Sequence, residues 1–284
     1  MRPFSIAGLQ LELQRRDNIE QICGEILTTA RVYPFVDMVL LPELCWFGAD
    51  TSRAEALPGP TEERMCSVAR EAGVWLVGGS LYERADGKIY NTCPIISPEG
   101  KIVTRYRKIY PFLPYEAGIA NGDCCAVFDI PDVGRFGISI CYDMWFPETI
   151  RQLTWMGAEV VLHPSLTNTI DRDSETAISR ANATMHQSYF FDLNAAGMGM
   201  GQSGVYGPGG EVMHKAGSNR EIIIVELDLD HVRRVRERGW HGLGQVMKSY
   251  RDANVRYPVY EQGTQASSSF EALGPMHFHK RDRG

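Results

Sequence analysis

Hydrophobic positions along the chain follow two alternating patterns. Apolar runs typical of strands occur at residues 4–11, 38–41, 74–81, 127–130, 137–141, 159–163, 189–195 and 222–229. Between several of these runs, at residues 18–32, 61–72, 147–156 and 174–187, apolar positions recur with the spacing of one helix face. In the first of these helices, that face carries Ile19, Ile22 and Ile26. Strands that alternate with helices in this way predict an α/β domain.

Turn signals refine this picture. Residues 90–96 and 101–106 flank Pro98–Gly100 and predict a hairpin, and strands 204–206 and 222–229 are predicted to be joined through Pro208–Gly210. Hairpins mixed with buried strands predict a mixed sheet, or two stacked sheets, covered by helices. We place one domain at residues 1–262. The polar segment 263–284 is predicted to be a tail that is partly disordered or contacts another subunit.

Composition excludes several classes of protein. Of the 284 residues, 44% are hydrophobic and 23% are charged, which is typical of an ordinary globular protein. The net charge of -6 provides no basic excess for a nucleic-acid partner. The apolar runs are far shorter than a membrane span. Seven cysteines without framework spacing, and no signal-like apolar stretch at the start, lead us to expect reduced thiols and a cytoplasmic location.

Cys141 is the first candidate for chemistry. It ends the apolar run 137–141, and Tyr142 and Asp143 follow it before Pro147 can open a helix. The ends of strands are where open α/β sheets place their functional groups. A buried free cysteine is also common as ordinary packing, so this thiol needs partners before a catalytic role follows.

Two charged residues also follow predicted strands. Glu43 comes directly after Leu41 and Pro42, and Lys108 lies between the strand 101–106 and Pro111. Each alone is typical of a solvated strand end. Together, a Leu-Pro-Glu strand end, an Arg-Lys before an aromatic-proline segment, and Cys-Tyr-Asp followed by Phe-Pro-Glu resemble the nitrilase superfamily of carbon–nitrogen hydrolases in order and approximate spacing. The resemblance covers roughly residues 4–255.

The resemblance implies a four-layer αββα sandwich and a set of catalytic roles. Glu43 is expected to be the general base, Lys108 the electrostatic stabiliser and Cys141 the nucleophile. The chemistry agrees, because a thiol of ordinary pKa is mostly protonated at neutral pH and needs a base. Lys108 and the backbone N–H of Tyr142 are expected to form an oxyanion hole. Burial should raise the pKa of Glu43, although Lys108 opposes the rise.

Further site residues flank these three. Glu116 lies eight residues after Lys108, where aliphatic amidases carry a second glutamate, so the resemblance implies that Glu116 orients substrate and supports the lysine. An exposed loop carboxylate is the plain alternative. Tyr142, Trp145, Tyr115 and Trp46 are predicted to bind substrate along a narrow apolar pocket, although core packing would explain such aromatic residues equally well.

The resemblance leaves the branch of the family open. Nitrilases proper usually carry Cys-Trp-Glu at the nucleophile, whereas this chain has Cys141, Tyr142 and Asp143, which favours an amidase. Primary amide hydrolysis therefore ranks first, hydrolysis of an N-carbamoyl compound second, with Arg172 or Arg180 as carboxylate binders, and nitrile hydrolysis third. A thiol protease pairing Cys141 with His163 or His186, and a non-catalytic binding protein of the same fold, remain as alternatives from other classes.

Partners and cofactors follow from the same reading. We expect a small-molecule amide substrate and no organic cofactor. We also expect no metal, because the adjacent Cys124 and Cys125 are badly placed for one tetrahedral site. Proteins of this family usually pair through helices, so a homodimer or higher homo-oligomer is expected. No nucleic-acid or membrane partner is expected.

Overall fold

The computed structural model describes residues 3–261 and 268–276. One sheet has seven strands in the order β15-β1-β3-β4-β6-β5, with β7 pairing the other edge of β6. Its strands are β1 (Phe4–Gln10), β3 (Met38–Leu40), β4 (Trp75–Val77), β5 (Leu81–Ala85), β6 (Lys88–Ile96), β7 (Ile102–Arg107) and β15 (Glu221–Leu227). Every residue of β1 is buried, as expected for a central strand with neighbours on both sides and layers above and below.

The second sheet has six strands in the order β14-β13-β11-β10-β9-β8. They are β8 (Ala126–Ile130), β9 (Gly134–Ile138), β10 (Val160–Ser165), β11 (Tyr189–Asn194), β13 (Gly204–Tyr206) and β14 (Val212–Lys215). β9, β10 and β11 run parallel, as do β1, β3 and β4 in the first sheet. A small ribbon of β2 (Glu12–Leu13) and β12 (Ala196–Gly197) links the two halves of the chain.

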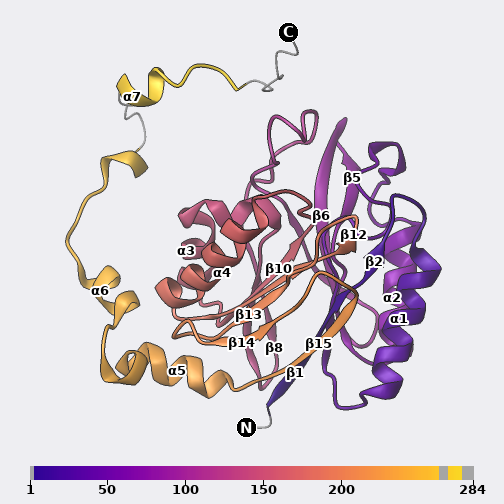
Figure 1. Cartoon of the computed structure of the whole chain (residues 1–284), viewed down its shortest axis with the longest axis horizontal. Coiled ribbons are helices and arrows are strands. Elements are labelled where there is room, and N and C mark those ends of the chain that lie inside the picture. Colours follow the sequence, from indigo (N-terminus) through magenta and orange to yellow (C-terminus); the bar gives the residue numbers. More distant parts are fainter. Residues whose placement is uncertain (1–2, 262–267, 277–284) are drawn as a thin grey trace.

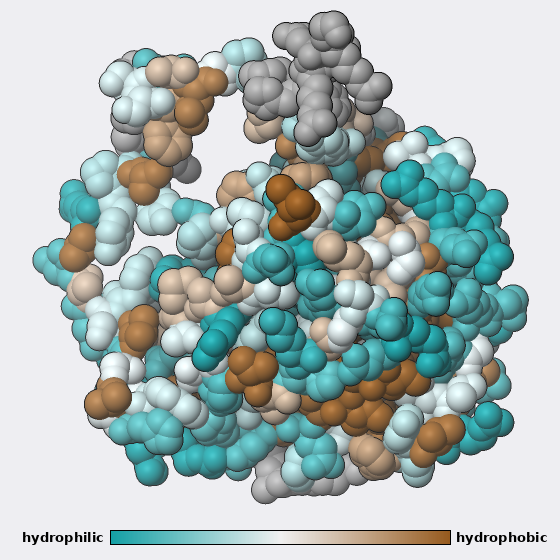
Figure 2. All heavy atoms as spheres, in the orientation of Figure 1, coloured by the Kyte–Doolittle hydropathy of each residue, from teal (hydrophilic) through white to brown (hydrophobic). Residues whose placement is uncertain are grey.

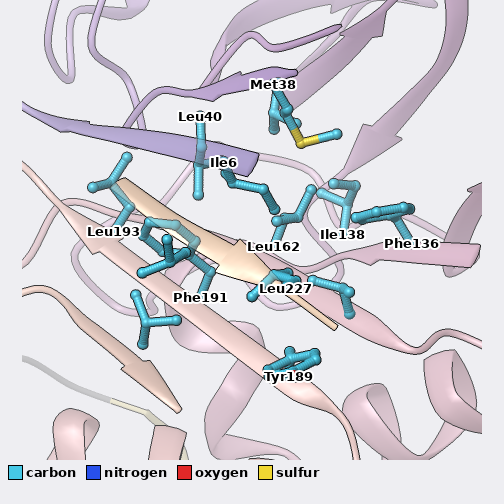
Figure 3. Packing of buried hydrophobic residues seen from close by; sticks show 14 of the residues in the cluster. Ile6, Met38, Leu40, Phe136, Ile138, Leu162, Tyr189, Phe191, Leu193 and Leu227 are labelled. Carbon is cyan, nitrogen blue, oxygen red and sulfur yellow. The ribbon is translucent and has the colours of Figure 1, made fainter. Parts of the chain in front are cut away.

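The two sheets face each other across an apolar core (Figure 3). Ile6 and Leu40 from the first sheet pack in one cluster with Ile138, Leu162 and Phe191 from the second (Figure 3). Outside the first sheet lie α1 (Ile19–Val32) and α2 (Pro60–Ala72), and outside the second lie α3 (Pro147–Trp155) and α4 (Arg172–His186) (Figure 1). This arrangement confirms the predicted αββα sandwich.

Three strand assignments differ from the sequence prediction. The strand expected at 137–141 is β9, which ends at Ile138, so Cys141 opens the short 3₁₀ helix η2 (Cys141–Trp145). The run 74–81 is two strands, β4 and β5, which are not neighbours in the sheet. Strand 204–206 turns through Pro208–Gly210 into β14, and the 222–229 run is β15, which pairs with β1 in the other sheet. Alternation alone does not say which sheet receives a strand, because that choice depends on long-range pairing.

The C-terminal part of the chain leaves the sandwich after β15. It comprises α5 (Leu229–Arg238), η3 (Trp240–Gly242), α6 (Val246–Asp252), η4 (Pro258–Tyr260) and α7 (Ser268–Glu271). α5 still packs on the body and buries Leu229, Val232 and Val235. The segment after α5 runs as an arm beside α3 and α4 (Figure 1), and its outer part stands away from the body (Figure 2). It contacts α3 where Trp155 meets Tyr250 edge-on and where the Tyr260 hydroxyl bonds Glu148 at 3.0 Å.

Part of the predicted tail, 263–284, lies outside the described residues. Its described section, residues 268–276, contains the apolar side chains of Phe270, Leu273 and Met276, all exposed. The division of the chain into a domain at 1–262 and a tail therefore stays a prediction. Among the helices of the described part, none is long and apolar enough to cross a membrane.

Candidate active site

Cys141 lies in a strained turn directly beyond β9. Its φ of 47° is in the left-handed region, which non-glycine residues rarely adopt, and such strain is typical of functional turns. Asp143 holds this turn: its carboxylate accepts a bond from the N–H of Ile140 at 2.9 Å and from the hydroxyl of Tyr106 at 2.7 Å. The same carboxylate accepts the N–H of Tyr110 at 2.9 Å. The backbone at the thiol is therefore fixed before any ligand binds.

Glu43, Lys108 and Glu116 come together beside this turn. Glu43 follows β3, and Lys108 follows β7. The Lys108 ammonium lies 2.9 Å from a Glu43 oxygen and 2.8 Å from a Glu116 oxygen. The charges of Glu43, Lys108 and Glu116 all act on the pKa of the Cys141 thiol, so all four predicted catalytic side chains lie at one place. Lys108 and Glu43 are fully buried, and Glu116 is partly buried.

The two sheets converge here because the strands end at the same edge. β3 and β9 both belong to parallel sets, and the chain leaves each at its carboxyl end. The N–H of Glu43 donates to the carbonyl of Ser165 at the end of β10, at 3.3 Å. This bond joins the edge of one sheet to the edge of the other at the site.

Burial and charge set the protonation of the resting site. Burial raises the pKa of the Cys141 thiol well above its ordinary value, Glu43 raises it further, and Lys108 opposes the rise. Burial likewise raises the pKa of Glu43, against the attraction of Lys108. For Lys108, burial lowers the pKa, but Glu43, Cys141 and Glu116 outweigh it, so its pKa lies well above the ordinary value. The site therefore combines a neutral thiol, a buried cation and a carboxylate able to take the thiol proton.

Aromatic side chains form a continuous cluster next to the nucleophile. Tyr142 meets Trp145 and, edge-on, both Phe112 and Phe146, while Phe112 stacks on Tyr115 at 5.1 Å between ring centroids. Three of the four predicted substrate-binding residues, Tyr115, Tyr142 and Trp145, thus belong to one cluster. Tyr115 and Trp145 keep exposed surface, which suits them to line an entrance.

Trp46 is placed elsewhere. It is fully buried in the core beneath α1 and α2, and its indole N–H donates to the carbonyl of Gly78 at 2.8 Å. The structure gives Trp46 a packing role, and the prediction that it binds substrate is withdrawn. Proximity in sequence to Glu43 was misleading because the chain turns toward the helices after the carboxylate.

The histidines and one of the arginines considered for other reactions have hydrogen-bond partners other than the Cys141 thiol. His163 bonds Ser139 at 2.6 Å, and His186 bonds the carbonyl of Asn182 at 3.0 Å. Burial lowers the pKa of each imidazole to about 4. Arg180 donates to the carbonyl of Gly210 at 2.6 Å. These contacts favour Glu43 over a histidine as the base of Cys141.

Two side chains at the site carried no signal in the sequence. Asn91, in β6, donates its amide to the Glu43 carboxylate at 2.8 Å, and its backbone carbonyl accepts the N–H of Lys108. Thr167 lies 3.9 Å from the Cys141 sulfur. Within the described residues, no group of three or more His, Cys, Asp or Glu side chains is arranged to hold a metal ion.

Comparison with known proteins defines the family. Residues 10–237 match the family model for carbon-nitrogen hydrolases. The chain belongs to the carbon–nitrogen hydrolase family. Human omega-amidase NIT2 is 30% identical over 260 residues, covering 84% of this chain and 93% of that protein. The Xenopus tropicalis omega-amidase NIT2 is 32% identical over 244 residues, covering 78% and 87%.

Solved structures agree with this assignment. Saccharomyces cerevisiae Nit3, a member of branch 10 of the nitrilase superfamily, superposes with a TM-score of 0.76 at 27% identity, covering 83% of this chain and 94% of that one. An amidase from Nesterenkonia sp. shares the fold with a TM-score of 0.73 at 22% identity, covering 83% and 94%. The family, the fold and the class of enzyme predicted from sequence, an amidase-type hydrolase of the nitrilase superfamily with a catalytic cysteine, are confirmed.

Proposed function

We propose that this carbon–nitrogen hydrolase converts a primary amide to a carboxylate and ammonia through a thioester on Cys141. The observation that carries the proposal is the contact of one buried lysine with two carboxylates beside a buried thiol. A lysine held in this way keeps its charge without water, which is the property needed to stabilise an oxyanion. The curated relatives named omega-amidases support an amide as substrate.

Each proposed step uses a residue already in place. Glu43 takes the thiol proton as the sulfur attacks the carbonyl carbon, and Lys108 with the N–H of Tyr142 receives the oxyanion. When the C–N bond breaks, protonated Glu43 gives its proton to the leaving ammonia. Glu43 then takes a proton from water, which attacks the thioester and releases the acid and the Cys141 thiol. Glu116 orients Lys108 and, through its 2.6 Å bond from the N–H of Phe112, ties the lysine to the aromatic cluster.

The acyl group is proposed to be apolar. Tyr115, Tyr142 and Trp145, joined by Phe112, offer ring faces and edges beside the nucleophile. Arg172 is ion-paired with Glu175 and Asp192, and Arg180 is bonded to a backbone carbonyl. Because both guanidinium groups are occupied, a carbamoylase that uses one of them to bind a substrate carboxylate has less support than an amidase.

A matched substrate set tests this ranking. The amide, the nitrile and the N-carbamoyl amine of one apolar acyl group are compared for ammonia release, with Cys141→Ala as control. We expect release from the amide that is lost in the control. Release mainly from the nitrile or the carbamoyl compound would contradict the amidase assignment, and no release across several acyl groups would favour a binding protein of the same fold.

We also propose that the protein is a homodimer or larger homo-oligomer. Trp155 on α3 is 62% exposed, and the arm that follows α5 exposes Val259, Phe270 and Leu273. Apolar surface of this kind marks an interaction site, and a second copy would cover it. Light scattering of the purified full chain should give at least twice the 31.8 kDa of one chain. A mass equal to one chain at micromolar concentration would contradict this proposal.

A cytoplasmic location is part of the same proposal. All seven cysteines of the sequence are unpaired in the structure, and Cys124 is exposed. Free thiols persist where the environment is reducing.

A further inference from the structure

The hydroxyl of Thr167 lies on the side of Cys141 formed by the six-stranded sheet. Its oxygen is 3.9 Å from the sulfur and donates its proton to a Glu175 carboxylate oxygen at 3.0 Å. The backbone of Thr167 is clamped: its N–H and its carbonyl both bond the side-chain amide of Asn194 at 2.9 Å, and the carbonyl also accepts the N–H of Met200 at 3.0 Å. A buried threonine held at three points is a fixed contact for the thiol.

Glu175 is fixed in turn by a buried ion-pair network. Arg172 bonds Glu175 at 3.1 Å and the Asp192 carboxylate at 2.8 Å, and it donates to the carbonyl of Gln202 at 3.0 Å. Arg172, Glu175 and Asp192 are all buried. The network joins the start of α4 to β11, so Glu175 cannot move away from Thr167 without breaking a buried ion pair, which is costly.

These contacts place Cys141 between two groups of side chains, one from each sheet, and each group contains a glutamate. Glu43, with Lys108 and Glu116, approaches Cys141 from the loops of the seven-stranded sheet. Glu175, through Thr167, approaches from α4 and β10. Because the Thr167 proton is committed to Glu175, the hydroxyl oxygen presents a lone pair to the sulfur and accepts the S–H proton rather than donating to a thiolate.

We propose that Thr167 and Glu175 are a positioning pair for the nucleophile: the hydroxyl, oriented by Glu175, holds the Cys141 side chain in one rotamer and keeps it as the thiol until Glu43 removes the proton. The pair contacts Cys141 and not the reacting carbon, so its role is positioning. The inference deepens the proposed amide hydrolysis and rests on it only for the role of Cys141 as nucleophile.

The charges around the sulfur are consistent with this role. The groups that face Cys141 are Glu43, Lys108, Glu175 and Glu116; after burial and Glu43, the Glu175 charge is a further cause that raises the pKa of the thiol, while Lys108 lowers it. Glu175 itself is faced by Arg172 and Asp192, and burial raises its pKa. Removing the acceptor oxygen or the negative charge should therefore lower the pKa of Cys141.

The test is the pH dependence of iodoacetamide alkylation at Cys141, resolved from the other cysteines by peptide mass spectrometry. Thr167→Val removes the hydroxyl with little change of shape, and Glu175→Gln removes the charge. Each is expected to move the alkylation profile to lower pH by about one unit. The thiol loses an acceptor for its S–H proton in Thr167→Val and a negative charge that raises its pKa in Glu175→Gln. Each is also expected to reduce kcat/KM for the amide about 10-fold, because the sulfur loses its fixed orientation.

Two control variants separate positioning from general damage. Thr167→Ser keeps the hydroxyl and should keep both the wild-type alkylation profile and the wild-type kcat/KM. Ser179→Ala removes a 3.1 Å bond to Asp192 in the same network without touching Thr167, and should leave the profile unchanged. The double variant Thr167→Val/Glu175→Gln should shift the profile by less than the sum of the two single shifts, because Glu175 acts partly by orienting the Thr167 hydroxyl.

The contrary results are equally specific. An unchanged alkylation profile in folded Thr167→Val, or an equal shift in Ser179→Ala, would overturn the proposal. Alkylation does not need turnover, so a shifted profile in a protein that hydrolyses no amide would uphold the positioning pair and refute the amidase function. If Glu175→Gln does not fold, Thr167→Val and Thr167→Ser still decide the matter.

Discussion

Replacing Cys141 by alanine is expected to abolish amide hydrolysis, a loss of roughly a million-fold, because no other group at the site can form the acyl-enzyme. The fold should survive, since the side chain that holds the turn is Asp143, with bonds to Ile140, Tyr106 and Tyr110. Steady-state ammonia release measures the loss, and a urea titration confirms that the variant is folded.

The matched control is Cys124→Ser. Cys124 is the exposed cysteine and lies outside the cluster of catalytic side chains, so this variant should keep full activity. A Cys141→Ala protein that keeps even one tenth of the wild-type rate would remove Cys141 from the mechanism.

Replacing Lys108 by methionine is expected to damage both activity and stability. The change removes one donor to the oxyanion, which typically costs about 100- to 1000-fold in rate. It also leaves the buried Glu43 and the partly buried Glu116 without the cation that both contact, for a loss of about 3–5 kcal/mol in the free energy of unfolding. Methionine keeps the length of the side chain, so packing contributes little to the effect.

The comparison variants are Lys88→Met and Glu43→Gln. Lys88 lies at the exposed start of β6 and should change neither quantity. Glu43→Gln removes the base but leaves Lys108 paired with Glu116, so activity should be lost with a smaller loss of stability. A Lys108→Met protein with wild-type kcat/KM would exclude an electrostatic role for the lysine, whatever its stability.

Much of the fold follows from local patterns in the sequence. Helix spacing at 18–32 and 61–72 corresponds to α1 and α2, and the apolar runs before Glu43 and Cys141 correspond to β3 and β9. What failed was the predicted connection of strand 204–206 to strand 222–229 through Pro208–Gly210. The 222–229 run became β15 beside β1, more than 200 residues earlier in the chain, and no local pattern encodes such a pairing.

Some residues of the site could be predicted from the sequence, and others could not. Glu43, Lys108, Glu116 and Cys141 occur in recognisable motifs and lie together in the structure. Asn91 and Thr167 were missed because a single amide or hydroxyl in a strand or loop resembles any other polar residue until tertiary structure places it. Trp46 was misplaced for the opposite reason, since its closeness to Glu43 in sequence does not decide which face of the chain it occupies.

The most direct test of the mechanism is to trap its covalent intermediate. The protein is mixed with an excess of the best amide from the matched set, quenched with acid on the millisecond scale, and examined by intact-protein and peptide mass spectrometry. We predict a mass increase equal to the acyl group, located on the peptide that contains Cys141 and absent from Cys141→Ala. Full turnover with no acyl adduct at any quench time, or an adduct on another residue, would contradict a thioester on Cys141.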